Sequence, residues 1–212
     1  MKKFVIKSLI NYIKNNKQYS KEELEIIEYG ISNLYLQITK TIVITAIAIV
    51  LKIFIPYLIF IITYNVIRMP SFGIHAKKSW QCWISSIIIF NAIPYLITIV
   101  NLSGYIKIIL FIIATLYLTY YSPADTKKRP IISAKRRKIY KCISCMISII
   151  YSFLCLYIKD QIVANAFLFS LILQCFIVSP FTYKIFGQPY NNYKNYLWEE
   201  VLYVCKYLRI LR

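Results

Sequence analysis

Long apolar stretches alternate with short polar or basic stretches along most of the chain. Each approaches the roughly 20 residues that a helix needs to cross a bilayer, although the second is short and contains Pro56 near its start. The pattern therefore predicts an all-α, polytopic membrane protein with about six transmembrane helices. A four-span alternative leaves the second and third stretches at the membrane interface. The predicted spans are residues 27–51, 53–67, 80–100, 105–121, 140–158 and 162–183.

The two ends of the chain carry apolar residues at helical spacing. Within residues 1–20, polar residues such as Lys7 interrupt the apolar positions, which argues against a secretory signal peptide and predicts a basic amphipathic helix on the membrane surface. Ser20 and Glu23 fit a capping box at the start of the first span. Residues 190–212 predict a similar amphipathic tail, with Trp198 as an interface anchor.

Composition narrows the class because two extremes occur together. Hydrophobic residues make up 59% of the chain, and 26 Lys and Arg against 8 Asp and Glu give a net charge of +18. A soluble globular domain has roughly 45–50% apolar residues, and a disordered basic arm has few aliphatic residues, so both classes are disfavoured. The apolar runs leave no soluble core to present a basic face, so no nucleic acid is expected as a partner.

The basic residues mark one side of the predicted membrane protein, because Lys and Arg are retained in short cytoplasmic loops. With both termini in the cytoplasm, 22 of the 26 basic residues fall on the cytoplasmic side, eight of them in the loop at residues 122–141. Such a surface also attracts anionic lipid. No repeat or linker divides the chain, so residues 1–212 are predicted to form one membrane domain.

The six cysteines do not predict a disulfide framework. Five fall within the predicted spans, with Cys82 at the cytoplasmic end of its span, and Cys205 falls on the cytoplasmic side, where thiols stay reduced. Cys142 and Cys145 have C-x-x-C spacing, but no second pair and no nearby histidine or acid completes a tetrahedral metal site. We therefore interpret them as small packing residues, and no metal or cofactor is expected.

The single histidine, His75, lies seven residues before Cys82 in a basic loop. A thiolate nucleophile needs a base or cation near the sulfur, and a histidine, lysines and a helix start all occur here. A straight helix would separate the two Cα atoms by about 10 Å, so the segment must bend, and Pro70 and Gly73 allow this. A helix that begins near residues 77–80 places Cys82 in its first turn. The alternative is an interfacial histidine beside a buried thiol.

Residues 68–82 resemble a signature of the accessory gene regulator B family, membrane peptidases that process a quorum-sensing propeptide. The match has the form R-x-x-x-x-G-x-H-A-x-x-x-x-x-C and runs from Arg68 to Cys82. Residues 122–131, which read SPADTKKRPI, are similar to a second block of the family. The family often has two glycines before the histidine motif, whereas Phe72 precedes Gly73 here.

The resemblance implies a membrane-embedded cysteine endopeptidase that cleaves the C-terminal part of a small amphipathic propeptide and cyclises the product to a thiolactone or lactone. His75 matches the catalytic histidine and Cys82 the nucleophile. The implied location is the bacterial cell membrane, with a cytoplasmic active site, and a homodimer is expected. Four basic residues also match basic positions of the family. They suit the acidic C-terminal tail of the substrate, and the alternative is that they serve membrane topology and lipid binding. These residues are Arg68, Lys127, Lys128 and Arg129.

Three further residues have supporting roles to weigh. Gln81 can place an amide near an oxyanion, and Asp125 can orient His75, but we favour a structural role for each, as a polar residue at the membrane edge or a turn cap. Gly73 is the expected hinge of the loop at residues 68–82. Two other function classes stay open: a small transporter or peptide exporter, for which Lys40 is the main intramembrane candidate, and a non-enzymatic membrane adaptor.

Overall fold

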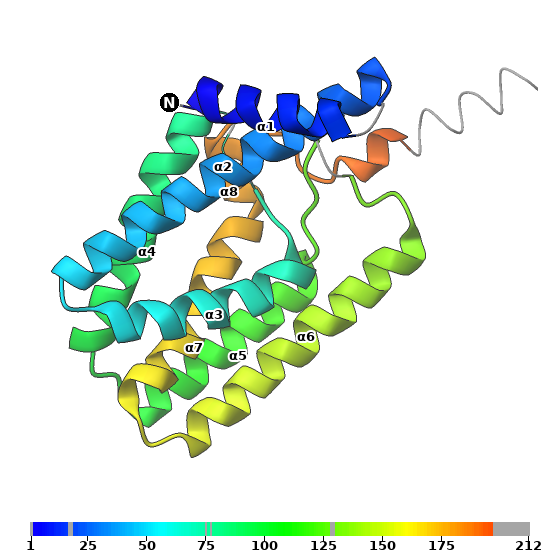
Figure 1. The fold of residues 1–212 in the computed structure, drawn as a ribbon. Helices are drawn as coiled ribbons and strands as arrows, with labels where there is room; N and C mark the ends of the chain where they lie inside the picture. The colour runs from blue at the N-terminus through cyan, green and yellow to red at the C-terminus, as the bar shows by residue number, and fades with distance from the viewer. Residues whose placement is uncertain (1, 17–18, 75, 77, 128–129, 197–212) are drawn as a thin grey trace, which may run out of the picture. The chain divides into compact units, whose positions relative to one another are not determined.

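The computed structural model is almost entirely helical and contains no β-sheet within the residues it describes, which are 2–16, 19–74, 76, 78–127 and 130–196 (Figure 1). Six of the helices are long and apolar enough to cross a membrane. The predicted all-α fold with six spans is therefore confirmed. The helices are α1 (Lys2–Asn16), α2 (Lys21–Val50), α3 (Phe54–Ser71), α4 (Ser79–Ile99), α5 (Gly104–Tyr121), α6 (Ala134–Tyr157), α7 (Gln161–Val178) and α8 (Pro180–Ile185).

Two helix boundaries differ from the expectation, and a serine explains each. The fifth span begins at Ala134, not near 140, because Ser133 accepts a hydrogen bond from the Arg136 amide and caps the helix. Residues 134–141 are therefore helical, and the connection between α5 and α6 is limited to residues 122–133. The sixth span ends at Val178, because Ser179 starts the short helix α8 with Pro180 in its first turn.

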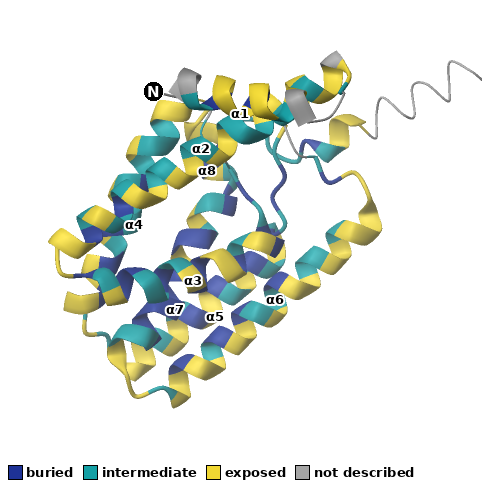
Figure 2. Cartoon of the chain, in the orientation of Figure 1, coloured by how far each residue is buried: buried dark blue, intermediate teal, exposed yellow. Residues whose placement is uncertain are grey.

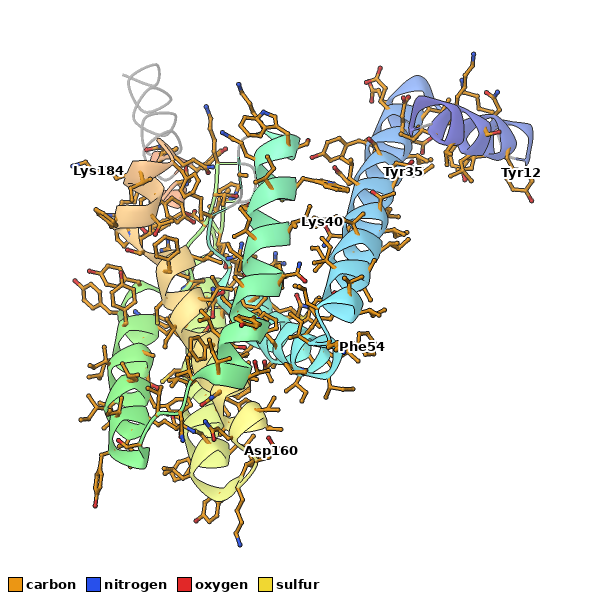
Figure 3. All side chains as sticks on the ribbon, turned by 90° about the vertical axis from the view of Figure 1, so that its left-hand side faces the viewer. Tyr12, Tyr35, Lys40, Phe54, Asp160 and Lys184 are labelled. Carbon is orange, nitrogen blue, oxygen red and sulfur yellow. The ribbon has the colours of Figure 1, made fainter. Side chains whose placement is uncertain are left out.

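The chain divides into two compact units, residues 1–52 and 53–212. In the first unit α1 packs on α2, and Ile6 and Ile10 of α1 are buried. The predicted capping box is confirmed: Ser20 accepts the Glu23 amide at 3.2 Å, and the Glu23 carboxylate accepts the Ser20 amide at 2.8 Å. Lys40 lies on α2 (Figure 3). Membrane contact of α1, the cytoplasmic termini and the single domain stay predictions, and most of the predicted tail lies outside the described residues.

In the second unit α7 occupies the centre and packs against α3, α4, α5, α6 and α8. Its apolar segment is 56% buried, against 17% for α5 (Figure 2). The outward faces of α4, α5 and α6 instead present exposed aliphatic side chains such as Ile88, Ile112 and Ile150. This arrangement, with an apolar exterior around a packed central helix, suits a lipid environment.

Polar side chains tie the helices of this unit together. The Tyr151 hydroxyl on α6 donates to the Thr63 carbonyl of α3 at 2.7 Å, and the Thr63 and Ser170 hydroxyls lie 2.8 Å apart between α3 and α7. Asn165 of α7 donates to the carbonyls of Ile97 and Val100 at the end of α4. Interhelical hydrogen bonds of this kind supplement close packing where lipid provides no hydrophobic force between helices.

Replacing Tyr151 by Phe should destabilise the second unit by about 1 kcal/mol, because it removes one buried interhelical hydrogen bond and leaves the ring in place. The measurement is the unfolding free energy in detergent micelles. Tyr157→Phe is the matched control, since that ring is 81% exposed, and it should have no effect. Equal stability of the two variants would contradict the role of this hydrogen bond.

Candidate active site at the α3–α4 connection

The loop that follows α3 is held by a side chain from the helix itself. The Arg68 guanidinium donates to the carbonyls of Phe72, Gly73 and Ile74, the last two at 3.2 and 2.9 Å. Phe72 is the C-cap of α3, and Gly73 and Ile74 follow it, so none of the three carbonyls has a backbone donor within the helix and Arg68 supplies one to each. Arg68 thereby fixes the three residues that precede His75. Substrate binding by Arg68 stays a prediction.

Two consecutive residues of this loop have positive φ. Gly73 has φ +115°, and a Cβ there would lie 2.5 Å from Arg68 Nη1 and 2.7 Å from Ile177 Cγ2. Phe72 has φ 55°, an unfavourable region for a residue other than glycine. The Phe72 carbonyl accepts hydrogen bonds from the Arg68 guanidinium and, at 2.8 Å, from the side-chain amide of Gln174. The Phe72 ring packs edge-on against Tyr140. Gly73 therefore forms a tight turn, and its hinge motion stays a prediction.

The two sequence blocks that resemble the family lie side by side. The Gly73 amide donates to the Ala124 carbonyl at 2.7 Å, and the Ala124 amide donates to the Ser71 carbonyl at 3.1 Å, so residues 72 and 124 form a short parallel bridge. The Ile74 amide donates to the Ile177 carbonyl at the end of α7. Segments about fifty residues apart in the sequence are thus joined through their backbones.

Asp125 is 2% exposed, and its carboxylate organises the surrounding backbone. It accepts the amides of Asn192 at 2.9 Å, Tyr193 at 2.8 Å and Ile131 at 3.4 Å. The Tyr183 hydroxyl donates to the Asp125 carbonyl at 2.8 Å. Burial raises the pKa of Tyr183, which keeps this hydroxyl protonated as a donor. Asp125 therefore holds residues 131, 192 and 193 together through their backbone amides. Its proposed role in orienting His75 stays a prediction.

Cys82 lies in the first turn of α4, because the helix begins at Ser79. The sequence-based expectation for this helix start is confirmed. The thiol is partly buried. The Gln81 side chain accepts the Lys78 amide at 3.3 Å, which makes it a cap of the same helix. An oxyanion role for Gln81 stays a prediction.

Arg68, Gly73 and Asp125 therefore lie close to one another, because the connection between α3 and α4 is hydrogen-bonded to the connection between α5 and α6. Lys127 lies in the same connection as Asp125 and is exposed. His75, Lys128 and Arg129 lie outside the described residues. The five described cysteines, Cys82 included, form no disulfide with one another, and the described residues hold no cluster of three metal-binding side chains.

Sequence reasoning missed the residues that support this loop from inside the bundle. Gln174 on α7 is fully buried and binds the Phe72 carbonyl. The Ser144 hydroxyl on α6 lies 3.0 Å from the hydroxyls of Ser71 and Ser122, so it connects both motif blocks. A polar amide within an apolar span was a usable signal for Gln174. Nothing in the sequence distinguishes Ser144 from the other serines of α6.

Comparison of the sequence with known proteins identifies a family. The model of the family named accessory gene regulator B matches residues 6–178. A putative AgrB-like protein of Clostridium acetobutylicum is 27% identical over 183 residues, covering 85% of this chain and 88% of the relative. A putative AgrB-like protein of Listeria monocytogenes is 25% identical, with 80% and 83% covered. The accessory gene regulator protein B of Staphylococcus aureus is 38% identical over 119 residues, with 55% and 63% covered.

No solved structure matches the chain significantly. The family match spans most of the sequence and both motif blocks. The chain therefore belongs to the accessory gene regulator B family, and it is a multi-pass membrane protein of accessory gene regulation by quorum sensing.

Replacing Asp125 by Asn should destabilise the protein by about 2 kcal/mol, because a charged acceptor of three backbone amides is lost. Amide hydrogen exchange at residues 131, 192 and 193 should accelerate. Asp160→Asn is the control: Asp160 caps α7 at its N-terminus, where Asn is an equally good cap, so stability should change little. Unchanged exchange at the three amides in Asp125→Asn would contradict the assigned role.

Replacing Gly73 by Ala should cost more than about 1 kcal/mol, because the side chain meets Arg68 and Ile177 in a backbone conformation that favours glycine. Gly30→Ala provides the opposite case: it lies within α2 with no atom within 4 Å of an added Cβ, so it should stabilise by up to about 1 kcal/mol. Thermal unfolding of the two variants checks both signs. A stable Gly73→Ala protein would show that the turn tolerates a side chain.

Proposed function

We propose that this protein is a cysteine endopeptidase that cleaves a small autoinducer propeptide, with Cys82 as the nucleophile and His75 as the base. The observation that carries the proposal is the position of Cys82 in the first turn of α4, directly after the loop that Arg68 and the Ala124 bridge hold in place. Backbone amides at a helix N-terminus favour negative charge, which suits an attacking sulfur. Family membership supports the same reaction class.

The reaction follows from thiol chemistry. His75 accepts the proton of the Cys82 thiol, and the sulfur attacks the carbonyl carbon of the scissile peptide bond. The carbon–nitrogen bond breaks, the leaving amine takes the proton from His75, and a thioester links the N-terminal part of the peptide to Cys82. A cysteine or serine within the bound peptide then attacks the thioester, which releases Cys82 and closes a thiolactone or lactone ring.

Thioester exchange with an internal thiol is close to neutral in free energy, so orientation and exclusion of water determine the product. Holding the internal nucleophile near the thioester makes the second step effectively unimolecular. A fixed loop serves that purpose better than a mobile one, and the hydrogen bonds of Phe72, Gly73 and Ile74 to neighbouring segments supply such rigidity.

The proposed substrate is an amphipathic propeptide with an acidic C-terminal tail. Lys127, Lys128 and Arg129 are the proposed contacts for that tail, through the attraction between a basic cytoplasmic surface and carboxylates. The proposal places the protein in the bacterial cell membrane as a homodimer, with its active site on the cytoplasmic side and anionic lipid around its basic loops. No cofactor enters the reaction.

Cys82→Ala should abolish cleavage of the propeptide without changing membrane insertion, because the nucleophilic sulfur is removed. His75→Ala should lower the cleavage rate by at least about a hundredfold through loss of the general base. Co-expression with the propeptide, followed by immunoblotting for the cleaved fragment, measures both. Cys142→Ala is the matched control, since Cys142 is exposed on α6 and enters no proposed step.

Normal cleavage by Cys82→Ala would overturn the proposal. Peptide transport into vesicles that survives Cys82→Ala while cleavage is absent from the wild type would favour the exporter alternative. Activity that resists thiol alkylation would favour the adaptor.

A further inference from the structure

A basic, tyrosine-lined cavity of about 560 Å³ opens where α5 ends and α6 begins. Its walls include three basic residues of α6 and no carboxylate among the lining residues. The proposed peptidase mechanism uses none of these side chains. The lining residues on which the argument depends are Tyr121, Arg137, Lys138, Lys141, Tyr190 and Tyr193.

Arg137 is the most informative of these residues. Its guanidinium stacks 3.4 Å above the centre of the Tyr193 ring. Its Nη1 atom is buried and has no hydrogen-bond acceptor within the described part of the chain. A buried guanidinium nitrogen without an acceptor is costly, and a small rotation of the Arg137 side chain toward an anion in the cavity would supply one. Lys141, one helical turn further, reaches the Tyr120 carbonyl only at 3.5 Å.

The tyrosines give the cavity a rigid wall. The Tyr190 hydroxyl donates to the Tyr121 carbonyl at 3.2 Å, and the Tyr190 ring packs edge-on against Tyr183. A tyrosine hydroxyl is neutral near pH 7, and burial raises the pKa of Tyr190 further, so its ring adds no charge that would repel an anion. Arginine, lysine and tyrosine together are typical of the interface between a membrane and water.

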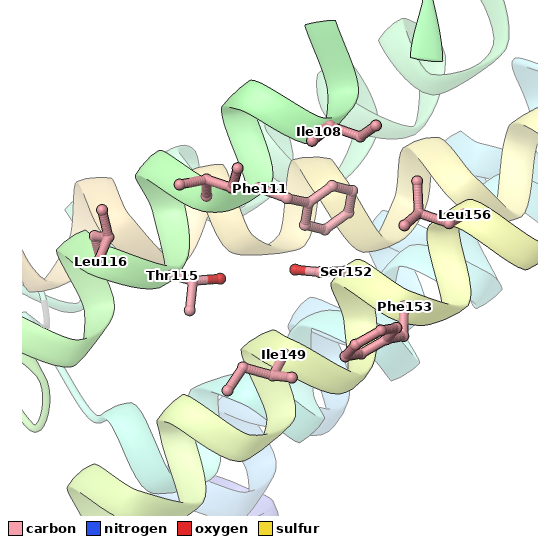
Figure 4. A pocket seen from close by; sticks show the side chains of 9 residues that line it. Ile108, Phe111, Thr115, Leu116, Ile149, Ser152, Phe153 and Leu156 are labelled. Atoms are coloured by element: carbon pink, nitrogen blue, oxygen red, sulfur yellow. The ribbon is translucent and has the colours of Figure 1, made fainter. Parts of the chain in front are cut away.

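An apolar groove of about 300 Å³ runs between the same two helices, further into the predicted bilayer (Figure 4). Ile112 and Leu116 line it from α5, and Ile149 and Phe153 line it from α6. Thr115 also lines the groove, and its hydroxyl lies 2.6 Å from that of Ser148, with which it forms a hydrogen bond. A lipid chain in the groove therefore leaves this hydroxyl with its partner. The groove begins about 6 Å below the cavity along α5 and about 12 Å below it along α6, at 1.5 Å per residue.

We propose that the cavity and the groove form one binding site for an anionic phospholipid, with the phosphate near Arg137 and Lys141 and an acyl chain between α5 and α6. The groove begins about one helical turn from the cavity along α5 and about two along α6, so one molecule with a charged headgroup and an acyl chain can reach both. A free phosphate ion explains the basic cavity but leaves the groove unused. A soluble acidic peptide likewise has no chain for a groove that faces the bilayer.

Direct binding of phosphatidylglycerol to the purified full-length protein tests the site, with native mass spectrometry as the readout and phosphatidylcholine as the neutral lipid. Arg137→Gln with Lys141→Gln should weaken phosphatidylglycerol binding by at least about tenfold, given roughly fivefold per basic residue near a membrane surface. Lys135→Gln with Lys184→Gln removes the same charge from exposed positions outside the cavity and should change binding less than twofold.

Two further variants separate the possible occupants. Arg137→Lys keeps the charge and should retain most of the binding, which distinguishes lost contacts from a misfolded protein. Ile149→Trp fills the groove and should weaken phosphatidylglycerol binding while leaving any binding of inorganic phosphate unchanged.

Each contrary result overturns the proposal. Equal phosphatidylglycerol binding by the Arg137→Gln/Lys141→Gln and Lys135→Gln/Lys184→Gln proteins would show that only net charge matters. Wild-type lipid binding by Ile149→Trp, with phosphate competing fully, would show a simple phosphate site. Loss of binding to an acidic peptide, with lipid binding intact, in Arg137→Gln/Lys141→Gln would show a peptide site. None of these results depends on the proposed peptidase activity.

Discussion

The backbone between α3 and α4 has no helical hydrogen bonds, so its amide and carbonyl groups need other partners at the end of an apolar helix bundle. The Arg68 side chain provides most of the donors for the carbonyls that follow α3. One guanidinium binds three consecutive carbonyls, while Gln174 adds a second donor to the first of them. With these acceptors hydrogen-bonded, the chain tolerates positive φ at Phe72 and Gly73, where it turns away from the end of α3. The position of the candidate active site therefore depends on an arginine that need not touch the substrate.

A second layer of support joins this loop to the segment after α5. The bridge between residues 72 and 124, the Ser144 hydroxyl and the Asp125 carboxylate connect it to α6 and to residues 192 and 193. The two family-like blocks therefore provide backbone hydrogen-bond partners for each other. Lys127, two residues after Asp125, therefore lies in a connection whose backbone is hydrogen-bonded to the loop that follows α3.

Much of the fold could be predicted from the sequence, because hydropathy over twenty residues reports directly on membrane spans. The Ser20 capping box and the placement of Cys82 in a first helical turn also depend on local pattern alone. The predicted start of the fifth span, near residue 140, was wrong. Four basic residues between 135 and 138 are typical of a loop, but they form the first turn of α6, which Ser133 caps. The contacts of Gln174 and Ser144 depend on how α3, α6 and α7 pack, which no local pattern encodes.

The proposed reaction requires that Cys82 form a covalent thioester with the N-terminal part of its substrate. The most direct measurement is intact mass spectrometry of the reconstituted protein, quenched in acid shortly after it meets a propeptide that lacks the internal cysteine or serine. We expect an adduct that has the mass of the N-terminal fragment less one water, maps to Cys82 and is removed by hydroxylamine. Cleavage of the peptide with no adduct on Cys82 at any time would contradict it.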